Sequence, residues 1–371
     1  MSEILDDLEA IGKLDTQGMW GILNSFDRQL EEALEIGLKA DIPAPKAIQN
    51  VLVCGLGGSA IAGDFLSAYL GTDLKVPLSV HRNYSVPGFA DEKTLALICS
   101  YSGNTEETLS AFHGARQAGC SIICLSSNGQ LQRDAGQYDY PLLQIPGAFP
   151  PRTALGYLAI PLLVVLSRVG LVSDRSEQIS RSVSWVRNRI ERFGLETPAE
   201  ENAAKALALQ VHQKIPVIYG SQDRLEMVAR RWRGQFSENA KQLAFSSAIP
   251  EMNHNEIEGW KHPAPALRQL IPIFLRDRED HPKVQIRTGI ARQLVGDKSE
   301  ACLDFWTEGE SWLERLWSLI LLGDFASLYL AVLNRENPTP VHVIEDFKKR
   351  LKEQTEKGHQ GGNEPGNLSR V

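Results

Sequence analysis

Residues 51–63 read Val51-Leu-Val-Cys54-Gly55-Leu-Gly57-Gly58-Ser59-Ala-Ile-Ala-Gly63, an apolar run followed by a glycine-rich loop. The apolar run is typical of a buried strand, and the residues after the loop are typical of a helix. Glycines allow backbone N–H groups to approach an anion, and the N-terminus of the following helix adds partial positive charge. The stretch therefore predicts the strand, phosphate-binding loop and helix of a parallel α/β sheet.

A second stretch of the same kind begins about forty residues later. The apolar run Leu95-Ala-Leu-Ile-Cys99 leads into Ser100-Tyr-Ser102-Gly103-Asn-Thr105, which is rich in hydroxyl groups. Two such loops, each between a buried strand and a helix, predict a pocket for one phosphate in the crevice beside the carboxyl ends of the strands. A phosphorylated small molecule is the expected ligand.

The same alternation of short apolar runs and helical segments extends from Ile48 to about Pro146 and restarts after Gly194-Leu-Glu-Thr-Pro198. The run Val217-Ile-Tyr-Gly220 is the counterpart of residues 51–55. The pattern predicts an α/β fold with two doubly wound parallel sheets. We expect a helical N-terminal segment (1–40), a phosphate-binding first domain (41–195), a second domain (196–352) and a disordered tail (353–371) that has almost no apolar residues.

Composition excludes several classes of protein. The chain has 371 residues, 43% of them hydrophobic, and a net charge of −7, so a nucleic-acid partner is not expected. Five cysteines without a C-x-x-C pair indicate reduced thiols and a cytoplasmic location. The N-terminus is acidic, unlike a signal peptide. The longest apolar stretch of the sequence is expected around Leu158 to Leu166, and this stretch is too short to span a bilayer. The expectation is a cytoplasmic enzyme without a membrane segment.

A dinucleotide site is the alternative for the first loop. Gly55-x-Gly57-x-x-Ala60 satisfies the dinucleotide pattern, and Arg82 at the end of the next strand could contact a 2′-phosphate. Ser59, however, places a hydroxyl where a pyrophosphate would pass, and the second loop suits one compact anion. We prefer a phosphomonoester, while a dinucleotide or a purely structural turn remains possible.

Single residues of the second half are ambiguous when taken alone. Glu238 falls near the end of a predicted helix whose apolar face comprises Met227, Trp232, Phe236 and Leu243. Its spacing favours a solvated or ion-paired carboxylate. His254 lies between asparagines, where a capping or surface imidazole is the simplest interpretation. The residues around it do not have metal-ligand spacing, so no metal site is expected.

Several motifs together resemble the bifunctional phosphoglucose/phosphomannose isomerases, which are dimers of chains with two sugar-isomerase (SIS) domains. The motifs are Gly55 to Asp64, Ser100 to Thr108, Pro151-Arg152-Thr-Ala-Leu-Gly-Tyr157, Ser237-Glu238-Asn-Ala-Lys241, Asn253-His254-Asn-Glu-Ile257 and Ile344-Glu-Asp-Phe-Lys348-Lys-Arg-Leu351. The resemblance implies two flavodoxin-like SIS domains, no cofactor, and isomerisation of a hexose 6-phosphate substrate.

The resemblance also implies roles for individual residues. Glu238 corresponds to the base that moves a proton between C2 and C1, and Arg152 to the cation beside the developing oxyanion. His254 and Lys348 correspond to the residues that open the sugar ring, and in this family the histidine comes from the neighbouring subunit of a homodimer. Thr339 lies where the family has a hydroxyl near the C2 epimer. The implied phosphate ligands are Gly57, Gly58, Ser59, Ser100, Ser102 and Thr105.

Arg152 taken alone is typical of an ion pair. Lys348 taken alone is typical of one solvated lysine among several in a terminal helix.

Two other functions remain open at this point. The protein could act on a different sugar phosphate, as other SIS isomerases do. It could also be a non-catalytic sugar-phosphate sensor, although no basic helix-turn-helix accompanies the two domains.

Overall fold

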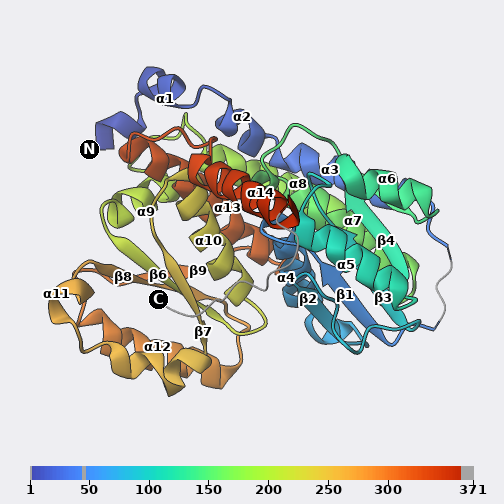
Figure 1. Ribbon diagram of the computed structural model, residues 1–371. Helices are drawn as coiled ribbons and strands as arrows, with labels where there is room; N and C mark the ends of the chain where they lie inside the picture. Colours follow the sequence, from blue (N-terminus) through green and yellow to red (C-terminus); the bar gives the residue numbers. More distant parts are fainter. Residues whose placement is uncertain (1, 44–46, 361–371) are drawn as a thin grey trace. The chain divides into compact units, whose positions relative to one another are not determined.

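The computed structural model describes residues 2–43 and 47–360 (Figure 1). The chain divides into two compact units, residues 1–338 and residue 339 onward. Each predicted domain contributes one parallel sheet to the first unit. The boundaries at 41–195 and 196–352 remain predictions, because both sheets belong to the same compact unit.

The first sheet has the flavodoxin-like order β2-β1-β3-β4-β5, with every neighbouring pair parallel. Its strands are β1 (Asn50–Cys54), β2 (Leu78–His81), β3 (Thr94–Cys99), β4 (Ser121–Ser126) and β5 (Leu142–Gln144). The order reverses between β1 and β3, and ligands of such sheets bind beside the carboxyl ends of the strands at this point. The doubly wound sheet predicted from the sequence is confirmed.

The second sheet repeats the first four strand positions of the first one. Its order is β7-β6-β8-β9, again with every pair parallel. The strands are β6 (Ile215–Ser221), β7 (Phe245–Ile249), β8 (Leu270–Arg276) and β9 (Leu303–Trp306). The duplication of one α/β unit, expected from the similarity of residues 51–55 and 217–220, is confirmed.

Helices surround both sheets and form the N-terminal segment. That segment contains the 3₁₀ turn η1 (Ser2–Leu5) and the helices α1 (Leu8–Leu14), α2 (Met19–Asn24) and α3 (Phe26–Lys39), as predicted. The helices of the first half are α4 (Gly58–Leu70), α5 (Glu106–Gln117), α6 (Gly129–Gln137), α7 (Leu155–Arg168) and α8 (Ser176–Phe193). Those of the second half are α9 (Ala203–Val211), α10 (Glu226–Asn239), α11 (Ala264–Leu267), α12 (Pro282–Gly296) and α13 (Trp312–Leu333). Further 3₁₀ turns are η2 (Gly71–Asp73), η3 (Pro151–Thr153), η4 (Glu251–His254) and η5 (Glu256–Gly259).

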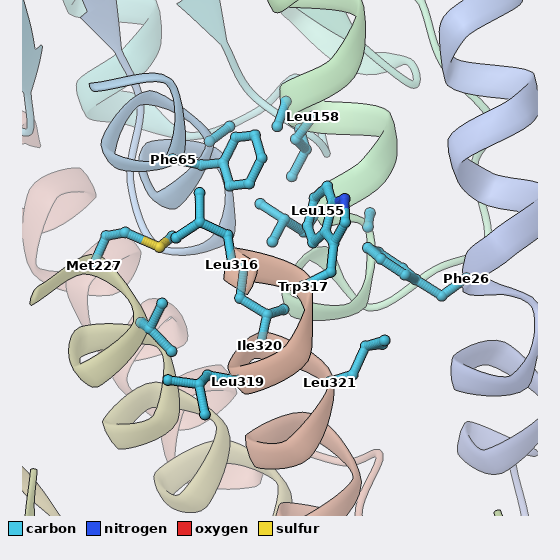
Figure 2. Close-up of a cluster of buried hydrophobic side chains, with 14 of the residues drawn as sticks. Phe26, Phe65, Leu155, Leu158, Met227, Leu316, Trp317, Leu319, Ile320 and Leu321 are labelled. Carbon is cyan, nitrogen blue, oxygen red and sulfur yellow. The ribbon is translucent and has the colours of Figure 1, made fainter. Parts of the chain in front are cut away.

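One hydrophobic core joins helices of both halves around Trp317 on α13. The Trp317 ring centroid lies 4.7 Å from that of Phe65 on α4 and 5.3 Å from that of Phe26 on α3. Figure 2 shows Leu155 of α7 and Met227 of α10 in the same cluster. Burial of such large side chains is the dominant stabilising contribution to a fold. Shared packing therefore holds together the N-terminal segment and the two α/β halves of the first unit.

The placement of the longest apolar stretch at Leu158 to Leu166 was wrong. Helix α13 has 22 residues and is long and apolar enough to cross a bilayer by length and composition. Its most apolar window is 94% buried inside the protein. A helix that is apolar on every side is typical of a protein core as well as of a membrane span, and α13 is a core helix of the first unit.

The second unit contains α14 (His342–Gln360). Residues 353–360 are therefore helical, which corrects the prediction that disorder begins at residue 353. Glu, Gln and Lys have high helix propensity even where no apolar residue is available for packing, so low hydrophobicity was a poor indicator here. The remainder of the predicted tail, 361–371, lies outside the described residues.

Candidate active site

The two predicted phosphate loops lie side by side at the carboxyl ends of β1 and β3. The backbone N–H of Tyr101 in the second loop donates to Ser59 Oγ in the first, at 3.1 Å. Within the second loop, Ser100 Oγ donates to Thr105 Oγ1 at 3.2 Å. Ser59 still has its own O–H to donate to a ligand. The structure thus brings the hydroxyls of both loops into one region.

The conformation of the first loop depends on two glycines. Gly57 has φ +52° and ψ −126°, a backbone conformation that favours glycine. A Cβ at Gly58 would lie 2.6 Å from the carbonyl oxygen of Pro151, so only glycine fits against that backbone. Because Pro151 precedes Arg152, this contact places the phosphate loop directly beside the arginine.

Two helices begin at these loops, at Gly58 for α4 and at Glu106 for α5. The first N–H groups of a helix have no intrahelical acceptor and favour an anion. The first turn of α5 contains Glu106 and Glu107, whereas the first turn of α4 has no acidic residue. The N-terminus of α4 is therefore the more favourable of the two for a phosphate. Ser102 lies at the exposed tip of the second loop, where its Oγ accepts from the N–H of Asn104 at 3.3 Å.

Arg152 and Glu238 are brought together although they are far apart in the sequence. Arg152 lies in η3 and is only 5% exposed, and its Nη1 is 3.4 Å from Glu238 Oε2. Glu238 lies in the last turn of α10, and its side chain is 32% exposed. The cation is therefore buried, while the carboxylate beside it remains partly accessible to solvent.

Further hydrogen bonds fix the guanidinium of Arg152. Its Nε donates to Asn239 Oδ1 at 2.5 Å and its Nη2 to the carbonyl oxygen of Pro338 at 2.8 Å. Asn239 Nδ2 in turn donates to Ser327 Oγ of α13, at 2.8 Å. Burial lowers the pKa of Arg152, while the charge of Glu238 opposes that change. The orientation of the cation is therefore set by groups from three segments of the chain, namely α10, residue 338 and α13.

A buried ion pair supports the backbone of Arg152. Arg231 Nη2 donates to the carbonyl oxygen of Arg152 at 2.9 Å and to Asp324 Oδ2 at 2.6 Å. Gln235 Nε2 donates to Asp324 Oδ1 at 2.8 Å. Burial raises the pKa of Asp324, and the neighbouring Arg231 opposes that change. Sequence patterns did not identify this network, whose members lie on α10 and α13.

The N-terminal segment also contacts the Arg152 turn. Gln29 on α3 is 1% exposed. Its Nε2 donates to the carbonyl oxygen of Thr153 at 3.0 Å, and its Oε1 accepts from the N–H of Gly156 at 2.9 Å. Gln29 thus satisfies backbone groups at the start of α7, and its position in a helical pattern gave no indication of this.

Lys241 is a further residue near the site to which the sequence assigned no role. Its Nζ donates to the carbonyl oxygens of Glu238, Asn239 and Asn337, at 2.9, 3.3 and 2.7 Å. Its φ of +53° ends the helix, so Leu243 lies beyond α10 and is 58% exposed. The assignment of Leu243 to the apolar face of that helix was wrong, because the backbone changes direction before it.

Three predicted residues remain, namely His254, Thr339 and Lys348. His254 is exposed in η4, and within residues 2–43 and 47–360 no hydrogen bond or ion pair joins it to Glu238 or Arg152. Thr339 and Lys348 belong to the second compact unit, where Lys348 lies on α14. The roles of these three residues remain predictions.

The structure bears on the dinucleotide alternative and on the expectation that no metal is bound. Arg82 Nη2 donates to Asp64 Oδ2 at 2.5 Å, and Arg230 Nη1 lies 3.4 Å from the same oxygen. Arg82 is thus engaged with a carboxylate, which weakens the case for a 2′-phosphate there. In the described part of the chain, no group of three or more His, Cys, Asp or Glu residues could hold a metal ion.

Residues 200–351 match the model of the bacterial phospho-glucose isomerase C-terminal SIS domain. The chain is 39% identical, over 90% of its length and 99% of the relative, to a bifunctional phosphoglucose/phosphomannose isomerase of Caldicellulosiruptor bescii. It is 32% identical, over 88% of its length and 97% of the relative, to a D-glucosamine-6-phosphate 4-epimerase of Sulfolobus acidocaldarius. The fold is similar to that of a hypothetical protein of Thermus thermophilus, with a TM-score of 0.70, 15% identity and 94% of each chain covered. The chain belongs to the family of the bifunctional phosphoglucose/phosphomannose isomerases, as its motifs had indicated.

Proposed function

We propose that the protein interconverts glucose 6-phosphate and mannose 6-phosphate with fructose 6-phosphate, in the cytoplasm and without a cofactor. The observation that supports this most strongly is the pair of Arg152 and Glu238, 3.4 Å apart, with the backbone before Arg152 packed against Gly58 of the first phosphate loop. The names of the bifunctional relatives support the same activity and substrates.

The proposed reaction begins with the phosphate held by Gly57, Gly58, Ser59, Ser100, Ser102 and Thr105. The carboxylate of Glu238 then removes the proton from C2 of the open-chain aldose. The electron pair of that C–H bond forms the C1–C2 double bond of a cis-enediol(ate), and the negative charge moves to the sugar oxygens. Arg152 stabilises this charge, which is larger in the transition state than in the substrate. Return of the proton from Glu238 to C1, with the hydroxyl proton of O2 moving to O1, gives the ketose.

Ring opening precedes this step, because hexose phosphates are mainly closed rings. We assign it to His254 and Lys348, which exchange protons with the ring oxygen and O1. Family resemblance supports this assignment, and His254 would come from the partner of a homodimer. His254 is exposed in η4, which leaves its side chain accessible to a partner subunit.

An assay of purified, EDTA-treated protein with fructose 6-phosphate tests the activity, provided that glucose 6-phosphate and mannose 6-phosphate are measured separately. We expect both products, and we expect Glu238→Gln to lower kcat by at least about 10³-fold because the base is lost. Glu226→Gln, at the other end of α10, is the matched control. Activity that required added zinc, or that persisted in Glu238→Gln, would contradict the mechanism. Turnover of glucosamine 6-phosphate alone would favour the activity named for the Sulfolobus relative.

A further inference from the structure

Lys241 links two segments that position the proposed base and cation. Two of its acceptors, the carbonyl oxygens of Glu238 and Asn239, belong to the end of α10, and the third belongs to Asn337. Residue 337 is followed by Pro338, whose carbonyl oxygen accepts from Arg152 Nη2 at 2.8 Å. The ammonium group therefore bridges the backbone of Glu238 and the segment that binds the guanidinium of Arg152.

We propose that Lys241 is a positioning residue, whose ammonium group fixes the carboxylate of Glu238 relative to the guanidinium of Arg152. This inference rests on the roles proposed above for Glu238 and Arg152. An ammonium group has three N–H donors, enough for all three carbonyl acceptors, whereas a neutral amine has two. Loss of the proton must therefore release at least one of the three contacts. A shift of about 1 Å at a catalytic group is enough to lower kcat strongly.

The surroundings of Lys241 bring this loss of a proton closer to neutral pH. Desolvation of the ammonium group and the positive charge of Arg152 lower the pKa of Lys241 to about 8, while Glu336 and Glu238 oppose the change. Lys241 is thus mainly charged below about pH 8 and mainly neutral above it. Because only the charged form can make all three contacts, we expect kcat to be highest on the acidic side of this pKa and to decline on the alkaline side.

The test is a pH profile of kcat and KM from pH 6 to 10 for the wild type, Lys241→Met, Lys241→Arg and Glu238→Gln. We expect wild-type kcat to fall above pH 8 while the protein stays folded. Lys241→Met should have kcat lowered at least about tenfold at pH 7 with no alkaline decline of this origin, and a KM within about twofold. Lys241→Arg keeps the charge, so it should recover part of kcat and move the decline to higher pH.

Lys39→Met is the matched control, because it removes a lysine that does not contact the backbone of the proposed site. The Nζ of Lys39 lies 2.7 Å from the carboxylate of Glu35 on the same helix. The Lys39→Met enzyme should match the wild type throughout. A Lys241→Met enzyme with wild-type kcat, or with the same decline above pH 8, would overturn the proposal. If Lys241→Met does not fold, the other two enzymes still decide. A wild-type kcat that is constant up to pH 10 overturns the proposal. A decline in wild-type kcat that is abolished or moved to higher pH in Lys241→Arg supports the proposal. An active Glu238→Gln would instead refute the roles of the catalytic pair, so the two failures are distinguishable.

Discussion

Gln29 of the N-terminal segment donates a hydrogen bond to the carbonyl oxygen of Thr153, the residue after Arg152, at 3.0 Å. The same side chain accepts from the N–H of Gly156 at 2.9 Å. Both contacts are buried, and they link α3 to the turn between the phosphate loops and α7. A segment that contains none of the proposed catalytic residues therefore contributes to the geometry of the site.

Gln29→Leu removes both contacts and leaves two buried backbone groups without their partner. Each unsatisfied group costs about 1 to 3 kcal/mol. We expect a lower free energy of unfolding and a lower kcat, because the turn that positions Arg152 is less restrained. Denaturant unfolding and steady-state kinetics measure the two effects. Gln117→Leu, at an exposed position of α5, is the control; equal behaviour of the two variants would show that the contacts do not matter.

The sequence predicted the features that depend on local pattern. Strands such as Val51 to Cys54, the two phosphate loops and the duplicated α/β unit follow from apolar runs and glycines that are close together in the chain. The contacts of Arg152 with Asn239 and Pro338 join residues 87 and 186 positions apart. No periodicity indicates such pairs, because they depend on how the helices pack.

The errors have physical explanations as well. Helix α13 was not recognised as the longest apolar segment because Glu314, Arg315 and Asp324 interrupt its sequence. In the structure Arg315 and Asp324 are buried and paired, with Asp277 and Arg231 respectively. Burial of paired charges is tolerated where the partner is fixed in place. The partners lie outside α13, with Arg231 on α10 and Asp277 directly after β8.

Gly58→Ala tests the contact between the first phosphate loop and the Arg152 turn. The added Cβ would lie 2.6 Å from the carbonyl oxygen of Pro151, and backbone must move to relieve the clash. We expect a higher KM and a lower kcat together, since the loop and the arginine are displaced at once. Steady-state kinetics with fructose 6-phosphate gives both parameters.

Gly136→Ala is the matched control for that change. Gly136 also lies in a helix, α6, and a Cβ there meets nothing within 4 Å. Alanine has the higher helix propensity, so this variant should be stable and fully active. A Gly58→Ala enzyme with unchanged kinetics would mean that the turn can move without affecting the site.

Ser102→Ala tests the phosphate loop with little structural disturbance. Ser102 is exposed and its hydroxyl accepts from the N–H of Asn104 in the same loop, whereas Ser59 holds the backbone of Tyr101 in the other loop. A hydrogen bond to a charged phosphate contributes about 1.5 to 3 kcal/mol. We expect KM for fructose 6-phosphate to rise about tenfold or more with kcat less affected. Ser110→Ala, exposed on α5, is the control, and an unchanged KM in Ser102→Ala would place the phosphate elsewhere.

The last prediction concerns the subunit from which His254 acts. Glu238→Gln and His254→Ala should each be inactive on closed-ring substrate, the first in proton transfer and the second in ring opening. If His254 acts across a homodimer interface, a mixed dimer of the two variants has one site with both wild-type residues. Random exchange of subunits should then restore about a quarter of the wild-type activity.

The recovery is measured after mixing the two variants under conditions that permit exchange, with dimers of differently tagged chains isolated to verify it. Each variant exchanged with itself is the control and should stay inactive. Substrates with a larger open-chain fraction should partly rescue His254→Ala and leave Glu238→Gln inactive, which separates the two chemical steps. If exchange occurs and no activity returns, Glu238 and His254 act within one chain, and a dimer would not be required for catalysis.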